Sequence, residues 1–292
     1  MINNKLRKDS EVAAKFTITI FILMRFVAIV IYSIAKMCGN INSNYADNDP
    51  YVGFTPTTYY LYEGIISFVS VSIPTVAANT RYKRSSNKSV SLKKIKRNSF
   101  IPIVFLGMAL CMIAQIIITL IGISFNFLGF DIYRGLDLQI ATGTFDLIMN
   151  IICTAIIPAI IEEFAYRGFV LGLLKKHGDM FAIFASAFLF GMLHGNFVQI
   201  PFAFMVGLIV GYIRVQTNSL LPGILIHFSN NLYAVVITYL NEIIPIQVDA
   251  IEICYSVTVV LIGLFAARYL VKNNKEFFTL KDTKSWVVSQ NS

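Results

Sequence analysis

Repeated long apolar stretches constrain this chain more than any other feature of its sequence. The 292 residues are 56% hydrophobic and only 14% charged. A helix of about 20 apolar residues spans the hydrocarbon core of a bilayer and satisfies its own backbone hydrogen bonds there. The sequence therefore predicts an all-α polytopic membrane bundle with about eight transmembrane helices, at 16–37, 59–80, 101–125, 145–176, 180–196, 198–215, 219–240 and 251–271.

These stretches form one predicted membrane domain over 1–292, without an internal repeat or a second domain. Within it we expect amino-terminal helices at 16–127, a core at 145–240 and a cytoplasmic tail at 272–292. Ala203, Gly207 and Gly211 place small residues at every fourth position, which lets helices pack closely. We expect that packing inside the chain rather than between two copies, and the sequence specifies no oligomeric state.

The net charge of +8 is distributed unevenly along the chain. Eight crossings place both ends on one side of the membrane, and the basic residues of 81–97 and of both ends fall on that side. Lys and Arg are enriched in cytoplasmic segments, so both termini are predicted to be cytoplasmic. The run at 81–97 is interpreted as this topology signal, with membrane lipids as a compatible partner and nucleic acid as an improbable one.

Three polar clusters interrupt the apolar sequence. Acidic side chains at bilayer depth cost roughly 2.5–3.5 kcal/mol on insertion scales, and they usually serve a function. Only three histidines occur in the chain, and two of them lie in these clusters. The clusters are Glu162-Glu163 with Arg167, Phe190 with His194, and His227 with Asn231.

In the first cluster, Glu163 and Arg167 have the spacing of a helical ion pair. Glu162 points about 100° away on the helix and has no local counter-charge, so it is a candidate general base. The alternative is a juxtamembrane turn in which one carboxylate is paired and the other is solvated.

In the other two clusters, residues four apart share a helix face. Phe190 can form a wall beside His194, and Asn231 can orient His227 or face a substrate carbonyl. Either histidine alone could be a packing residue. Glu162 and His194, however, lie at similar depths of roughly 21 Å along their helices, and a tilt would bring His227 level with them. The clusters are thus predicted to meet in one cavity.

Two hydrolytic schemes fit such a cavity. His194, His227 and Glu162 could bind a catalytic zinc ion with water at its open position. Alternatively, Glu162 deprotonates water without a metal while His194 stabilises the oxyanion. The sequence lacks HExxH, GxGD and GxSxG signatures of other hydrolases.

The ordered motifs EExxxR, FxxxH and HxxxN on successive membrane helices resemble the CPBP family of CAAX proteases and bacteriocin-processing (Abi) proteins, which includes the CAAX prenyl endopeptidase. The resemblance covers about 145–235. It implies an intramembrane (metallo)endopeptidase in which Glu162 activates water. Glu163, Arg167 and Phe190 would support the site, and His194, His227 and Asn231 would complete it.

The composition indicates a bacterial plasma membrane, where a peptide or protein precursor is a more natural substrate than a prenylated protein. Some relatives act without catalysis, so a membrane scaffold in bacteriocin immunity or sensor regulation is the alternative. An ion-coupled transporter is disfavoured because no internal repeat is evident.

Overall fold

The computed structural model describes residues 4–42, 52–82, 92–93, 95–130, 132 and 141–279. These residues form an all-α bundle, as the apolar stretches predict. Its elements are α1 (Asn4–Met37), α2 (Pro56–Tyr82), α3 (Arg97–Phe127), α4 (Thr144–Asn150), η2 (Ile151–Ile156), α5 (Ile157–Glu163), η3 (Phe164–Val170), α6 (Leu171–Leu174), η4 (Lys175–His177), α7 (Asp179–Leu193), α8 (Gln199–Thr217), α9 (Leu221–Ile243), α10 (Pro245–Asn273) and η5 (Lys275–Phe278).

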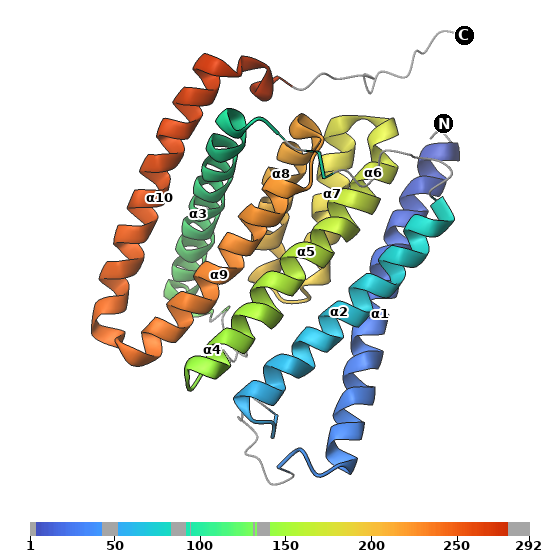
Figure 1. Cartoon of the computed structure of the whole chain (residues 1–292), viewed down its shortest axis with the longest axis vertical. Coiled ribbons are helices and arrows are strands. Elements are labelled where there is room, and N and C mark those ends of the chain that lie inside the picture. Colours follow the sequence, from blue (N-terminus) through green and yellow to red (C-terminus); the bar gives the residue numbers. More distant parts are fainter. Residues whose placement is uncertain are drawn as a thin grey trace.

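Among the described residues, seven helices are long and apolar enough to cross a membrane. One of them is a continuous helix from α4 to η4, Thr144–His177, which we call the composite helix. The span expected at 180–196 corresponds to α7, whose 15 residues cover about 22 Å, less than the hydrocarbon core. The start of α1 and the end of α10 lie at the same end of the bundle (Figure 1). Most of the tail and of the basic run at 81–97 falls outside the described residues.

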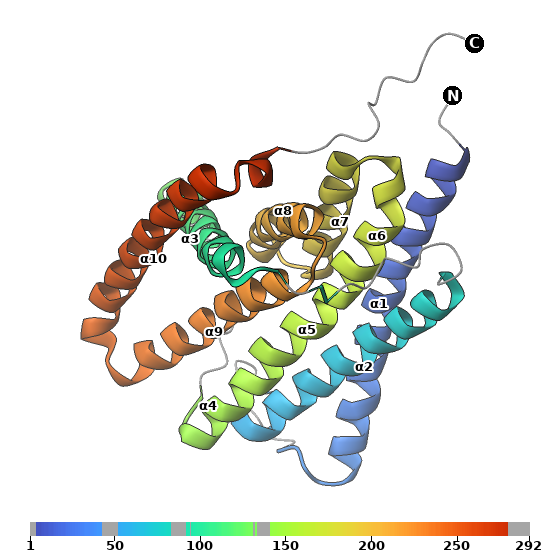
Figure 2. The same ribbon diagram turned by 45° about the horizontal axis from the view of Figure 1, so that its top comes forward.

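The helices are arranged around the composite helix. In two views, α2, the composite helix and α9 lie side by side, with α1 beyond α2 and with α3 and α10 beyond α9 (Figures 1 and 2). The hairpin of α7 and α8 packs behind this row. The composite helix is thus enclosed by α2, α7 and α9, and side chains from these neighbours can meet at its midpoint.

Small residues set the closest helix crossings. A Cβ atom built on Gly207 of α8 would lie 2.8 Å from the Cβ of Ala187 of α7. A Cβ on Gly263 of α10 would lie 2.1 Å from that of Ala109 of α3. The backbones approach this closely only because a side chain is missing. The small residues of α8 therefore pack within the chain, as expected from their spacing.

The composite helix departs from α-helical geometry twice, and α5 with its two glutamates lies between the two π-helical segments η2 and η3. Pro158 near the start of α5 has no N–H, so in an α-helix the carbonyl of Thr154 would lose its donor. Asn231 of α9 donates its Nδ2–H to this carbonyl at 3.2 Å. This hydrogen bond satisfies the helix at the irregularity and ties α9 to it. At the far end, Asp9 of α1 pairs with Lys176 and His177.

Candidate active site

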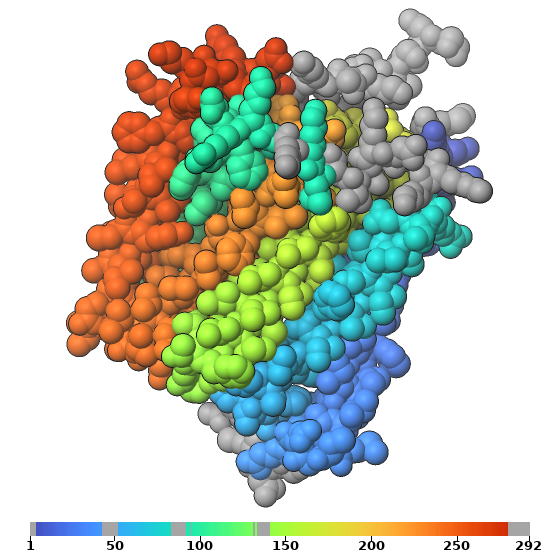
Figure 3. All heavy atoms as spheres, in the orientation of Figure 1, coloured from blue at the N-terminus to red at the C-terminus, as the bar shows by residue number. Residues whose placement is uncertain are grey.

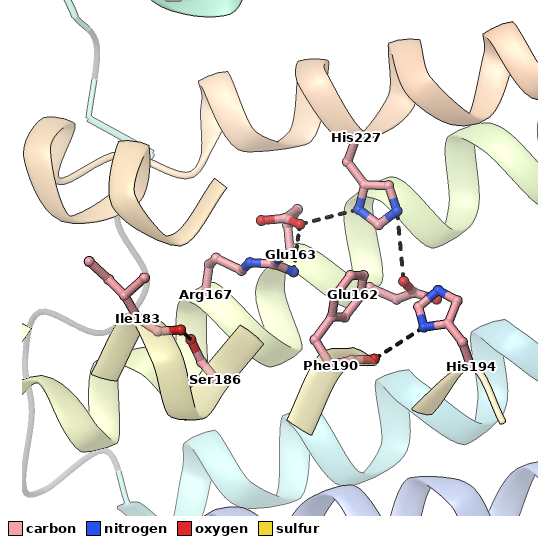
Figure 4. A network of polar contacts seen from close by, with 8 residues as sticks. All are labelled: Glu162, Glu163, Arg167, Ile183, Ser186, Phe190, His194 and His227. Carbon is pink, nitrogen blue, oxygen red and sulfur yellow. Dashed lines mark hydrogen bonds and ion pairs between the residues drawn. The ribbon is translucent and has the colours of Figure 1, made fainter. Parts of the chain in front are cut away.

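The two adjacent glutamates of α5 are buried at the centre of the bundle. Glu162 is 8% exposed and Glu163 is 1% exposed. Two ionised carboxylates at this depth require compensating partners because desolvation is costly. Their partners come from η3, α7 and α9, and Figure 4 shows the resulting network.

Glu163 has two cationic or proton-donating neighbours. Arg167 Nη1 lies 2.9 Å from Glu163 Oε1, and both side chains are about 1% exposed. His227 Nδ1 lies 3.2 Å from the same oxygen. The ion pair has the predicted spacing, but the link between Glu163 and His227 was not anticipated, because a contact between α5 and α9 leaves no trace in local spacing.

His227 stands between the two glutamates. A carboxylate only accepts, so the hydrogen bond to Glu163 places a hydrogen on Nδ1 of His227. The other ring nitrogen, Nε2, lies 3.8 Å from Glu162 Oε2. In the neutral imidazole, a nitrogen lone pair therefore faces a carboxylate oxygen across a gap that a proton donor can bridge.

His194 enters the same space from the carboxyl end of α7. Its Nδ1 lies 3.1 Å from the carbonyl oxygen of Phe190, one turn earlier. This carbonyl is one of the last in α7, where helix carbonyls lack a helical donor. Because the carbonyl only accepts, Nδ1 carries the hydrogen and the neutral ring keeps a lone pair on Nε2. Figure 4 shows the ring beside Glu162.

Phe190 is the wall shared by these groups. Its ring lies 4.3 Å from the guanidinium carbon of Arg167. Ring centroids of His194 and His227 lie 5.0 Å and 5.7 Å from it, both edge to face. A desolvated cation over an aromatic face is attracted by the ring quadrupole. Phe190 thus contributes to holding Arg167 in place and keeps both imidazoles in one orientation.

The structure brings Glu162, His194 and His227 together from three helices, with Glu163, Arg167 and Phe190 around them. Asn231 lies one turn beyond His227, but its hydrogen bond goes to Thr154 rather than to the imidazole. This partner could have been found from the sequence, since Pro158 leaves a carbonyl without its helical donor four residues earlier.

Comparisons with known proteins find similarity to CAAX proteases. The family profile described as Type II CAAX prenyl endopeptidase Rce1-like matches residues 144–233. The Membrane-embedded CAAX protease MroQ of Staphylococcus aureus (strain USA300) is 24% identical over 241 residues, which cover 78% of this chain and 90% of that protein. No solved structure matches the chain.

The core of the chain is thus similar to the CAAX protease (CPBP) family. The matched segment runs from α4 into α9 and contains all of the motif residues. This similarity supports a membrane protease. The amino-terminal helices lie outside the profile, so features there are properties of this chain rather than of the family signature.

Gly223 is a further residue of the site that was not predicted from the sequence. A Cβ atom at this position of α9 would lie 3.1 Å from Glu163 Oε2 and 2.7 Å from Val210 Cγ1. The missing side chain therefore lets α9 approach α5 closely enough for His227 to reach Glu163. Its only signal in the sequence is its position one turn before His227.

The zinc scheme requires three ligands that converge on one point. The tautomers of both histidines suit it, because Nδ1 is held by an oxygen acceptor and Nε2 presents a lone pair. In the part of the chain that the structure describes, however, no three His, Cys, Asp or Glu side chains are close enough to hold an ion. We therefore derive no step through a metal, and zinc binding by His194, His227 and Glu162 stays a prediction.

Proposed function

We propose that this protein is an intramembrane endopeptidase that hydrolyses a peptide bond in a membrane-associated peptide or protein precursor. The observation that carries this proposal is the convergence of Glu162, His194 and His227 at the buried midpoint of the composite helix. Groups that are this costly in a membrane and lie together are best explained by chemistry.

Glu162 is the proposed general base. Unlike Glu163, it has no arginine at ion-pair distance among the described residues. It takes a proton from a water molecule, and the oxygen attacks the carbonyl carbon of the peptide bond. The C–N bond then breaks, and the proton on Glu162 passes to the leaving nitrogen, which balances the hydrolysis.

The histidines hold the water and the developing charge. His194 Nε2 accepts a hydrogen bond from the second hydrogen of the water, which turns the oxygen lone pair toward the substrate. When the ring of His227 carries a hydrogen on both nitrogens, its Nε2 can donate to the oxyanion. Glu163 is a positioning residue, because it fixes the ring of His227 and is itself fixed by Arg167. Asn231 positions α9 through its bond to Thr154.

The proposed substrate is a peptide precursor in a bacterial plasma membrane. Support comes from the match to the CAAX prenyl endopeptidase profile and from the similarity to a membrane-embedded CAAX protease of the bacterium Staphylococcus aureus. Both termini are proposed to be cytoplasmic. A prenylated substrate is less natural in this setting than a peptide leader.

The test compares wild-type protein with Glu162→Gln in a strain that lacks the gene. Mass spectrometry should find a precursor that accumulates with Glu162→Gln and disappears with wild-type, and purified protein in liposomes should cleave it. Glu252→Gln is the matched control, because Glu252 is another acid on a membrane helix, and its hydrogen bond from Tyr233 at 2.8 Å does not involve the residues of the site. If Glu162→Gln retained full function, the protein would act as a scaffold and the proposal would be wrong.

A further inference from the structure

A cavity lies about two helical turns from Glu162, toward the opposite end of the composite helix from η4. Its volume is about 240 Å³. It is formed where α2, the start of the composite helix and α9 lie side by side, the same row that Figure 3 shows as adjacent bands on one face. The lining residues are Tyr59, Tyr60, Glu63, Asn150, Thr154, Ala234, Val235 and Thr238.

Glu63 is the charged residue of this cavity. It lies in α2, within a stretch apolar enough to cross the membrane, and it is only partly exposed. The hydroxyl of Tyr59 hydrogen-bonds to it, and a tyrosine that donates fixes the carboxylate in one direction. An acid in such a position is a candidate functional residue by default, and the catalytic scheme makes no use of it.

One cation already acts on Glu63 electrostatically, namely Arg25 of α1. Arg25 is exposed on the outer face of α1 and lies over the ring of Phe21 at 5.3 Å. It is not among the described residues that line the cavity. Inside the cavity, Glu63 therefore faces only neutral groups.

These neutral groups favour a cation over an anion. Asn150 is 7% exposed, and its side-chain oxygen accepts from the hydroxyl of Thr154. Besides the amide nitrogen of Asn150, the remaining polar side-chain atoms of the lining are hydroxyls, which can accept as well as donate. At low dielectric, a carboxylate with acceptors around it attracts a positive charge much more strongly than it would in water. About 240 Å³ also has room for a long side chain, since it equals roughly eight water volumes.

Thr154 links the cavity to the helices that carry the catalytic residues. Thr154 lines the cavity and also accepts, through its carbonyl, the hydrogen bond of Asn231. Glu162 follows Thr154 by eight residues on the same helix, a rise of about 12 Å. An extended peptide covers about 3.3–3.6 Å per residue. A substrate at Glu162 would therefore reach the cavity with a side chain three or four residues from the scissile bond.

We propose that this cavity is a substrate subsite in which Glu63 binds a lysine or arginine side chain three or four residues from the cleaved bond. The inference rests on the proposed protease function, and it assigns a specificity-determining role to a residue outside the segment matched by the family profile. Substrates would thus be apolar membrane peptides that carry a basic residue at a fixed distance from the cleavage point.

The test uses synthetic membrane peptides with a fluorophore and a quencher, in liposomes, with a single lysine moved one position at a time. Wild-type protein should prefer lysine over glutamine at one position, three or four residues from the cut. Glu63→Gln should lower the ratio of kcat/KM for the lysine peptide to that for the glutamine peptide by about ten- to hundredfold, which corresponds to the free energy of one charged hydrogen bond. The loss should appear in KM with kcat unchanged, because the contact is remote from the reacting atoms. Glu252→Gln, the other tyrosine-bound acid, should keep the preference.

A second arm measures binding of the same peptides to the Glu162→Gln protein by fluorescence anisotropy. If the lysine peptide binds more tightly than the glutamine peptide, and this difference is lost in the double variant Glu162→Gln/Glu63→Gln, the subsite is supported even if no peptide is cleaved. Absence of cleavage by the wild-type protein contradicts only the proposed function. Cleavage without a lysine preference, equal binding of the lysine and glutamine peptides, or a preference that survives Glu63→Gln, would overturn the subsite.

Discussion

The pair of Glu163 and Arg167 gives the sharpest quantitative prediction. Both side chains are about 1% exposed and 2.9 Å apart, so each charge depends on the other. Glu163→Gln leaves the guanidinium buried against the Phe190 ring without its carboxylate. Removal of one partner of a buried ion pair costs about 3–5 kcal/mol. We expect this loss in the free energy of unfolding in mixed micelles, and a similar loss for Arg167→Met, which leaves the carboxylate uncompensated.

The double variant Glu163→Gln/Arg167→Met should behave differently from the sum of the two. Replacement of a whole buried pair by neutral groups of similar volume is often close to neutral. The double variant should therefore regain at least about 3 kcal/mol relative to the sum of the single variants. The control is Glu11→Gln, which breaks the Arg7–Glu11 pair of the same 2.9 Å distance and four-residue spacing on an exposed surface; such a pair contributes about 0.5 kcal/mol or less.

Activity separates the two roles of Glu163. The carboxylate also fixes His227 through Nδ1 at 3.2 Å, and loss of such an orienting partner typically costs about 10- to 100-fold in activity. The double variant should thus recover stability but not cleavage. If the loss in the double variant equalled the sum of the two single losses, the charges would not be coupled. If cleavage returned together with stability, Glu163 would only support the fold and would not position His227.

Four further predictions follow from the site and the topology. Glu162→Gln should reduce cleavage by roughly 10²–10⁴-fold with normal accumulation, measured by turnover and immunoblot; wild-type turnover would refute the base. Gly223→Ala should cost about 1–3 kcal/mol by overpacking, whereas Gly143→Ala, with nothing within 4 Å of the new Cβ, should be neutral in the same unfolding assay. Reporter fusions after positions 45 and 90 should report opposite sides, with 90 cytoplasmic, and equal signals would contradict the topology. If zinc is used, metal analysis should find about one ion per chain, lost in a double histidine-to-alanine variant, and metal-free protein of full activity would exclude it.

Much of the fold could be predicted from the sequence because bilayer thickness converts apolar length directly into helices. The exception was α7, which was expected to cross the membrane at 180–196 but has only 15 residues and ends at Leu193. The side chain of His194 binds the carbonyl of Phe190 at that end. The apolar pattern alone does not reveal this end, because no charged residue follows Gly195 until Arg214.

The sequence predicted which polar residues would lie close together, but not which of their atoms would contact one another. Order and depth bring Glu162, His194 and His227 to one level, as the helix rise implies. Helical spacing, however, suggested that the glutamates face different surroundings, whereas both reach His227, one at each ring nitrogen. The π-helical segments on either side of α5 change the residue spacing of each turn, so angles taken from an ideal α-helix do not carry across them.

Glu63 is visible in the sequence as an acid inside an apolar stretch, but it belongs to no recognised motif and was not predicted to be functional. An acid inside an apolar stretch is itself a signal, but it stands alone in α2 without a recognisable partner motif. Its significance appears only when α2 packs beside the composite helix and a cavity forms between them.

The arrangement of charges explains why two adjacent glutamates are kept at such a cost. Glu163 is paired with Arg167 and held in one place by it, as a positioning group requires. Glu162 has only the second nitrogen of His227 beside it, at 3.8 Å, so its carboxylate can contact a molecule that enters the gap. A carboxylate that can contact a bound water in this way is placed to act as a general base. Glu163 thus positions the site through His227, whereas Glu162 takes part in the proposed reaction. Substitution of each glutamate should therefore reduce catalysis for a different reason.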